Sequence, residues 1–186
     1  KIIHYSIHLR KRGIFMSFHE IYAKDFENSV FHTIAKEWML ITAEKQMDGK
    51  PVANTMTASW GGLGHLWNKN VAFAFIRPQR YTKEFVDQSE YFSLCFFGGE
   101  KMKELGYLGT VSGRDEDKIQ KSGLTLTHLN GVPCFEEATA VLICRKLYVQ
   151  TLREDCFVDP ELAASVYPQK DFHDVYVGEV EKIFVK

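Results

Sequence analysis

Runs of apolar residues dominate the chain and predict β-strands. The six runs span residues 39–45, 52–58, 71–77, 91–97, 138–152 and 174–186. The first four have strand lengths, the fifth is long enough for one bent strand, and Gly178 interrupts the last. An Asp-Gly pair at 48–49 supplies the positive backbone angles of a tight reversal, so the first two runs are expected to form a hairpin.

Shorter segments with helical spacing lie between these runs. They span residues 28–38, 82–89, 100–106 and 115–123. Asn28 or Ser29 can cap the first helix, Thr82 begins the second, and Gly123 ends the last. Because strands dominate, helices are short and no βαβ alternation appears, we predict a mainly β fold with short α-helices, an antiparallel barrel with helices packed outside.

The 186 residues contain no internal repeat and no linker, which predicts a single domain spanning residues 16–186. Residues 1–15 precede Met16 and are basic, so we interpret them as a leader or an expression-derived extension. A signal peptide needs a longer apolar core than this segment has. An amphipathic arm at a membrane surface is the alternative.

Charge and cysteine usage narrow the class of protein. The 23 Lys and Arg balance 24 Asp and Glu, so no overall field favours nucleic acid, and no apolar run reaches the roughly 20 residues of a membrane span. The four cysteines stand far apart, which predicts buried free thiols in a reducing cytosol; they are Cys95, Cys134, Cys144 and Cys156. The seven histidines lack metal-ligand spacing. We therefore expect a cytoplasmic protein without a metal, nucleic-acid partner or membrane partner.

Three polar clusters interrupt the apolar frame. They read TASWGG at 57–62, RPQRYT at 77–82 and SGRDEDK at 112–118. Each joins a strand end to a loop or helix start, where unpaired backbone N–H groups and hydroxyls favour a phosphate. Arg77 and Arg80 add charge and forked donors. Plain turns and solvated arginines are the alternative interpretation, and neither common nucleotide-binding glycine pattern is present.

Four motifs, taken in their order along the chain, resemble those of a known protein family. The series N-x-M-T-A-S-W-G-G (54–62), R-P-x-R-Y-T (77–82), S-G-R-D-x-D-K (112–118) and D-F-H-D-V-Y-V-G-E-V (171–180) resembles the flavin reductase-like family of FMN-binding split barrels, which includes flavoredoxin. The resemblance runs in order over nearly the whole chain from Met16. It implies a Greek-key split β-barrel, a homodimer, and noncovalent FMN bound near the subunit interface.

The resemblance also implies a set of cofactor-binding residues. They are Asn54, Thr57, Ala58, Ser59, Trp60, Arg77, Arg80, Tyr81, Thr82, Ser112, Gly113, Arg114, Asp115 and Lys118. Small residues let the backbone approach the flavin, and Thr57 and Ser59 offer hydroxyls to its ribityl chain or phosphate. Trp60 either walls the isoalloxazine ring or is a plain core or interface tryptophan. Arg77, Arg80 and Thr82 fall on the family's phosphate-binding segment.

Two residues are the candidates for a catalytic role. An ammonium at Lys118 near the flavin N1/O2 edge would raise the reduction potential, whereas the alternative is an exposed lysine on a charged helix. His173 either faces the flavin or nicotinamide or is a hydrogen-bonded structural histidine. Asp115 caps the helix that follows it in the simplest interpretation.

The function that the resemblance implies is flavin-dependent oxidoreduction. NAD(P)H would pass hydride to bound FMN, and the reduced flavin would pass electrons onward. Hydride transfer needs no general acid–base pair, which agrees with the absence of a convincing catalytic dyad or triad in the sequence. Two alternatives remain: an electron carrier that serves a protein acceptor, and a flavin-binding module without turnover.

Overall fold

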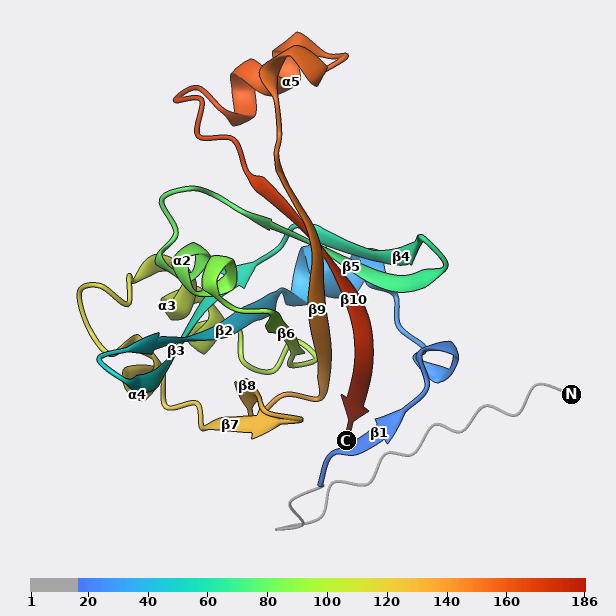
Figure 1. Cartoon of the computed structure of the whole chain (residues 1–186), viewed down its shortest axis with the longest axis vertical. Coiled ribbons are helices and arrows are strands. Elements are labelled where there is room, and N and C mark those ends of the chain that lie inside the picture. Colours follow the sequence, from blue (N-terminus) through green and yellow to red (C-terminus); the bar gives the residue numbers. More distant parts are fainter. Residues whose placement is uncertain (1–16) are drawn as a thin grey trace, which may run out of the picture.

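A computed structural model of the chain describes residues 17–186 and has a mostly β architecture (Figure 1). The strands are β1 (His19–Ile21), β2 (Met39–Met47), β3 (Lys50–Ala58), β4 (Gly61–Leu66), β5 (Lys69–Ile76), β6 (Tyr91–Phe96), β7 (Leu126–Leu129), β8 (Val132–Phe135), β9 (Ala140–Thr151) and β10 (Asp174–Val185). The helices are α1 (Val30–His32), α2 (Tyr81–Gln88), α3 (Met102–Thr110), α4 (Lys118–Ser122) and α5 (Pro160–Val166). Short 3-10 or π-helical turns lie at Ala23–Asp25, Thr33–Glu37 and Glu154–Cys156. The interpretation of residues 1–15 as a leader lies outside the described residues.

One curved antiparallel sheet forms the body of the molecule. Its strand order is β3-β2-β6-β9-β10-β5-β4, and β1 pairs with β10 beside this path. β3 and β4 are the two ends of the order, yet only Ser59 and Trp60 separate them in sequence. The sheet must therefore curl until its ends meet, although these two strands do not pair. This confirms the predicted mainly β barrel.

The continuous apolar runs arise because the central strands are covered on both faces. On β6 and β9, Leu94 and Leu142 belong to one buried cluster, whereas Cys95 and Ile143 belong to another. The first cluster fills the barrel, and the second packs under α3 and the β7–β8 hairpin. Since neighbouring side chains on a strand point to opposite faces, both sets of positions must be apolar.

Three tight reversals use residues with positive φ. The Asp-Gly pair at 48–49 joins β2 to β3, which confirms the predicted hairpin. Residues 67–68 and 130–131 join β4 to β5 and β7 to β8 in the same way; of these strands only β5 was predicted. The glycines of β4 hid its pattern, while the Asn-Gly pair at 130–131 was a usable hairpin signal.

The helix starts differ from the predicted ones. Thr82 does not begin its helix: α2 starts at Tyr81, and the Thr82 hydroxyl accepts a hydrogen bond from Asn54 instead. Asp117, not Asp115, caps α4, because its carboxylate accepts from the Gln120 N–H at 3.0 Å. Asp117 thus does with the same carboxylate chemistry what was expected of Asp115, whereas Arg80, the residue before α2, makes no side-chain capping hydrogen bond.

Other helix boundaries follow from packing. Gly123 has φ of 75° after α4, which confirms the predicted stop. Neither Asn28 nor Ser29 caps the first helix with its side chain; the Asn28 amide oxygen accepts from the Thr33 hydroxyl instead. α3 continues to Thr110, beyond the predicted end at residue 106.

Residues 152–172 form an arm that projects from the barrel between β9 and β10 (Figure 1). The arm contains α5, which was not predicted and which Asp159 caps by accepting from the Glu161 N–H. Cys156 lies on this arm and is exposed, so the expectation of a buried thiol is wrong there. The other three cysteines are buried, and burial raises the pKa of the Cys95 thiol to about 11.

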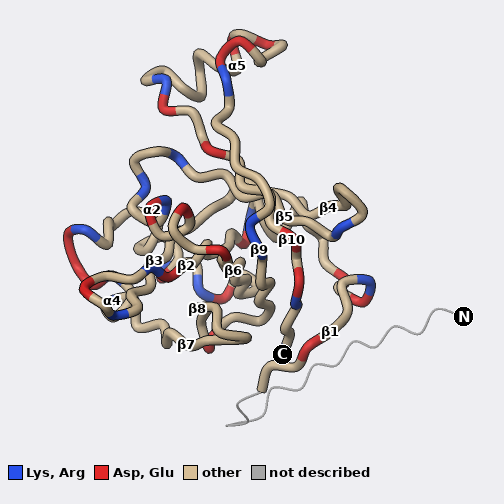
Figure 2. Tube along the Cα trace, viewed as in Figure 1, with Lys and Arg blue, Asp and Glu red and all other residues tan. Residues whose placement is uncertain are grey.

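Basic and acidic residues are both scattered among the elements in Figure 2, and their totals nearly balance. Within residues 17–186, no helix has both the length and the apolar character needed to cross a membrane. Any site for an anion must therefore be local.

Candidate functional site

Two adjoining depressions lie near the β3–β4 crossing, where residues 57–62 connect the two ends of the strand order. One has a volume of about 200 Å³ and is lined at its far end by Trp60 and His173. The other has a volume of about 330 Å³ and is lined at its far end by residues that include Thr82, Ser112 and Lys118. Both share Met56, Arg77 and Arg80. We call the two depressions together the groove, with an aromatic end and a cationic end.

Packing by itself requires a small residue at this crossing, independently of any bound ligand. A Cβ on Gly61 would lie 2.8 Å from the Phe73 carbonyl oxygen and 2.9 Å from the Met39 Cε. Any larger residue would push β4 away from β5 and from β2. Thr57, Ala58 and Ser59 line the groove, so the same bare stretch both closes the barrel and forms the groove wall.

Trp60 and His173 form the aromatic end. The Trp60 side chain is 48% exposed, and its ring centroid lies 5.0 Å from that of His173. His173 is 7% exposed, and its Nδ1 shares a hydrogen bond of 2.8 Å with the Tyr167 hydroxyl. Burial, and then the Arg77 guanidinium, lower the pKa of His173 to about 4. At neutral pH His173 is therefore a neutral imidazole, and it lines the aromatic end of the groove.

This lowered pKa predicts a loss of stability in acid. Because the unfolded chain binds a proton near pH 6.5 and the folded chain only near pH 4, the unfolding free energy falls as pH drops through this window. We expect His173 to contribute roughly 3 kcal/mol of this loss. Chemical denaturation of wild type and His173→Gln at pH 7 and pH 4 measures it: the variant should lose less stability. Equal losses would contradict the burial of a neutral imidazole.

The two arginines of the groove have different partners. Arg77 pairs with the Asp171 carboxylate, donates to the Val166 carbonyl at 3.1 Å, and lies 5.1 Å from the Tyr167 ring centroid. It is therefore tied to the arm. Arg80 is half-buried and donates to the Gly109 carbonyl at 2.6 Å, where α3 ends. Among the described residues, no carboxylate pairs with Arg80.

Lys118 is buried, so the alternative of an exposed helix lysine is wrong. It is 4% exposed, and its Nζ donates to the carbonyls of Leu108 at 2.9 Å and Val111 at 3.0 Å. Burial, with the nearby Arg80 charge, lowers the pKa of Lys118 to about 8. No carboxylate pairs with its ammonium within residues 17–186.

The cationic end therefore carries uncompensated positive charge. Burial and Arg77 lower the pKa of Arg80, and Arg80 in turn lowers that of Lys118, so the three cations repel one another. Asp171 neutralises only Arg77 in the described part of the chain. The first turn of α2, whose Tyr81 and Thr82 line this end, adds the positive end of the helix dipole. An anion bound here would relieve the repulsion and pair with these donors.

Buried polar contacts hold the groove walls together. Asn54 is 4% exposed and donates from Nδ2 to the Thr82 hydroxyl at 3.0 Å. A Cβ on Gly113 would lie 2.5 Å from the Asn54 Oδ1, so any other residue here would displace the Asn54 side chain that contacts Thr82. The Thr57 hydroxyl donates to the Leu105 carbonyl at 2.5 Å and links β3 to α3.

The structure brings most, but not all, of the predicted site residues to the groove. Arg114 and Asp115 are exposed and do not line it; Asp115 makes no side-chain hydrogen bond among the described residues. Asn54 and Gly113 line a neighbouring cavity instead, which shares Tyr81 and Lys118 with the cationic end. Sequence reasoning missed Met56, Phe75, Gln79, Thr110 and Val111. Met56 and Gln79 stand within the quoted motifs, whereas nothing local marks the other three.

The family model described as the flavin reductase like domain matches residues 31–186. The chain belongs to this family. No curated protein sequence matches the chain significantly.

Solved structures share the flavin reductase-like fold. An FMN-binding domain of a flavin reductases-like enzyme from Shewanella baltica is 16% identical, with a TM-score of 0.63 over 91% of this chain and 77% of that one. Flavoredoxin from Methanosarcina acetivorans is 24% identical, with a TM-score of 0.59 over 81% and 68%. An NADH:FAD oxidoreductase from Streptomyces globisporus, solved with NAD and FAD fragments, is 13% identical, with a TM-score of 0.59 over 81% and 74%. Another neighbour is described as having a split barrel domain, which confirms the predicted fold class.

The groove of this flavin reductase-like chain suits the two ends of FMN. The uncompensated cations and the α2 N-terminus match a phosphate, and the exposed Trp60 offers an aromatic surface to a ring. Met56, Arg77 and Arg80 line both depressions and so connect these ends. The residues present therefore fit the cofactor that the family implies.

Proposed function

We propose that this protein is an FMN-binding oxidoreductase that accepts hydride from NAD(P)H at the flavin and passes electrons onward. The observation that carries the proposal is the groove, in which an aromatic end adjoins a cationic end without a matching carboxylate for Arg80 or Lys118 among the described residues. Family membership supports flavin chemistry at this site.

The proposed binding mode gives each end of the groove one task. Arg80, Lys118 and the first N–H groups of α2 would hold the phosphate, because they supply charge and directed donors. Trp60 would lie beside the isoalloxazine ring, with Ser59 and the backbone of the crossing at its edge. Bound FMN supplies the two-electron chemistry, and the chain binds, orients and shields it.

Access to the ring end also supports electron exchange with a second molecule. Trp60 is half exposed, so this end of the groove opens to solvent. His173 is neutral beside it, and no acid–base pair is needed for hydride transfer. We further propose, from the resemblance, a cytoplasmic homodimer with FMN near the subunit interface and, in the alternative role, a protein electron acceptor.

The proposal predicts that NADH or NADPH will bleach the yellow absorbance of the FMN-loaded protein under anaerobic conditions. Free FMN with the same nicotinamide is the control, because only a site that orients both reactants should accelerate the transfer. An electron carrier would bleach with dithionite and not appreciably with either nicotinamide. A flavin-binding module would show neither nicotinamide oxidation nor electron delivery to an acceptor. A protein that refuses FMN altogether would end the proposal.

A further inference from the structure

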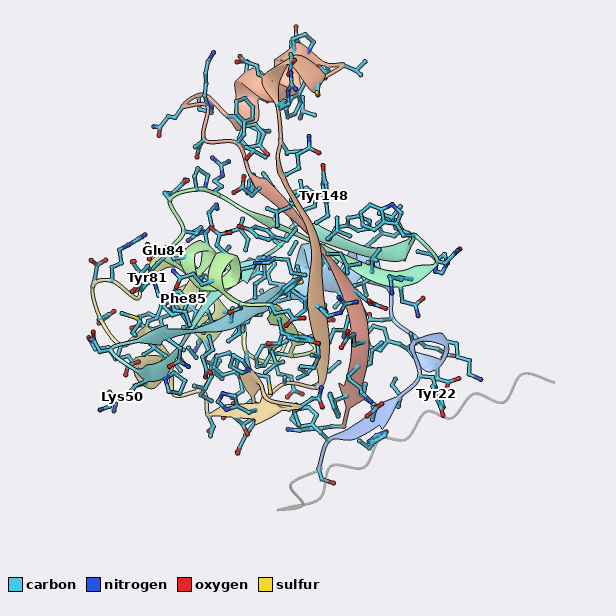
Figure 3. All side chains as sticks on the ribbon, in the orientation of Figure 1. Tyr22, Lys50, Tyr81, Glu84, Phe85 and Tyr148 are labelled. Carbon is cyan, nitrogen blue, oxygen red and sulfur yellow. The ribbon has the colours of Figure 1, made fainter. Side chains whose placement is uncertain are left out.

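A cluster of charged and aromatic side chains lies behind the cationic end of the groove. The Lys45 Nζ is 5.3 Å and the Arg114 Cζ 4.5 Å from the Tyr81 ring centroid. Glu84 binds both cations: Oε2 lies 2.9 Å from the Lys45 Nζ, and Oε1 lies 2.5 Å from the Arg114 Nη2. Figure 3 labels Tyr81 and Glu84 together on α2. We call these four residues the Tyr81 clamp.

The clamp joins three segments that are distant in sequence. Lys45 comes from β2, Tyr81 and Glu84 come from the first turn of α2, and Arg114 comes from the loop at 111–117. The Arg114 Nη1 also donates to the Gln79 carbonyl at 3.3 Å, just before α2. Arg114 therefore fastens this loop to the helix at two points, although it does not line the groove.

The loop and the helix start carry the two halves of the cationic end. Arg80 and Thr82 flank Tyr81, whereas Val111 and Ser112 lie on the loop that leads into α4. The Lys118 ammonium donates to the Val111 carbonyl, so a displaced loop would shift this buried cation as well. Fixing the loop against α2 thus fixes the spacing of the donors that face the groove.

We propose that Glu84 is a positioning residue for the phosphate of the bound flavin. Its carboxylate holds Arg114 over Tyr81 and thereby sets the distance between the α2 N-terminus and Lys118. This inference rests on the proposed function, since it assumes that the cationic end takes the phosphate of FMN. Glu84 touches neither depression of the groove, so its effect passes through Arg114.

Charge repulsion alone predicts the opposite change in FMN affinity when Glu84 is neutralised. Removing a negative charge near a phosphate site should strengthen binding of a dianion, because one repulsive charge is lost. Loss of positioning should weaken binding, because the donors are no longer held at matched distances. The direction of the change therefore distinguishes a positioning role from a background charge.

Glu84→Gln tests the proposal, with titrations by FMN and by riboflavin, which lacks the phosphate. We expect FMN affinity to fall on the order of fivefold, within the usual range of coupling through a contact network, and riboflavin affinity to stay the same. A general loss of structure would weaken both ligands equally.

Glu179→Gln is the matched control. Glu179 also bridges a lysine and an arginine, Lys69 at 2.7 Å and Arg145 at 2.6 Å, but it lies on β10 away from the groove. This variant should leave both affinities unchanged. Arg114→Leu should reproduce the FMN loss of Glu84→Gln, and the double variant should lose no more than either single one.

Three outcomes overturn the inference. Wild-type protein that binds FMN, together with unchanged or tighter binding by Glu84→Gln, would reject the positioning role and leave the proposed function intact. Wild-type protein that binds riboflavin as tightly as FMN would show that the cationic end does not take the phosphate, which rejects the inference and the binding mode but not flavin binding. Wild-type protein that binds neither ligand would reject the proposed function as well.

Discussion

Replacing Arg80 with alanine should weaken FMN binding by about 1.5 to 3 kcal/mol, which is roughly 10- to 150-fold in Kd. The side chain faces both depressions and lacks a carboxylate partner among the described residues, so its charge is available to a phosphate. Titration of the flavin-free protein with FMN measures the loss. Riboflavin affinity should change little, because riboflavin carries no phosphate.

The control must separate ligand contact from folding. Arg80 also donates to the Gly109 carbonyl, so thermal unfolding of the variant should accompany the titration. Arg153→Ala removes an arginine of the arm that pairs with Asp155 and is exposed, and it should leave FMN affinity unchanged. A folded Arg80→Ala protein with normal FMN affinity would assign Arg80 a structural role only.

FMN affinity should also fall as pH rises above 8, through Lys118. In the flavin-free protein burial and Arg80 lower the pKa of this lysine to about 8, and a bound phosphate should raise it again. Binding then requires a proton that the free protein has lost. The Kd should increase with pH above 8, and the slope should approach about tenfold per pH unit by about pH 9.5. FMN titrations across this range test the slope.

Lys118→Met keeps most of the side-chain length and removes the charge, so its FMN affinity should be weaker at pH 7 and nearly independent of pH to about 9.5. A wild-type affinity that is equally flat would contradict the role of Lys118 at the phosphate. The role that the sequence analysis assigned to Lys118, an ammonium at the N1/O2 edge, makes a different prediction. It requires a more negative flavin potential in Lys118→Met with little loss of FMN affinity, which a spectroelectrochemical titration would detect.

Packing also explains the small residues where β3 passes into β4. Gly61 permits the close approach to Phe73 and Met39 that closes the barrel. The Thr57 hydroxyl donates a hydrogen bond to the Leu105 carbonyl. The small residues are therefore constrained by packing even where they also face the groove. A substitution at Gly61 would disturb the fold before it disturbed any ligand.

Local sequence patterns by themselves determined most of the strands and where polar chemistry gathers. The apolar runs indicated β2, β3, β5, β6, β9 and β10, and the Asp-Gly pair indicated the first hairpin. These features depend on neighbouring residues, because side-chain alternation and turn angles are properties of short segments. The clusters at 57–62 and 77–82 do sit at strand ends, as predicted, whereas the cluster at 112–118 joins α3 to α4.

Tertiary structure alone decided which of those residues are buried, paired or free. Arg77 pairs with Asp171 across 94 positions of sequence, which leaves Arg80 as the arginine without a carboxylate among the described residues. Lys118 reads as an exposed helix residue until α3 supplies the carbonyls that bury its ammonium. Arg114 belongs to the clamp and not to the groove for a similar reason. Burial and partner choice depend on segments brought together by folding, and a local pattern does not contain them.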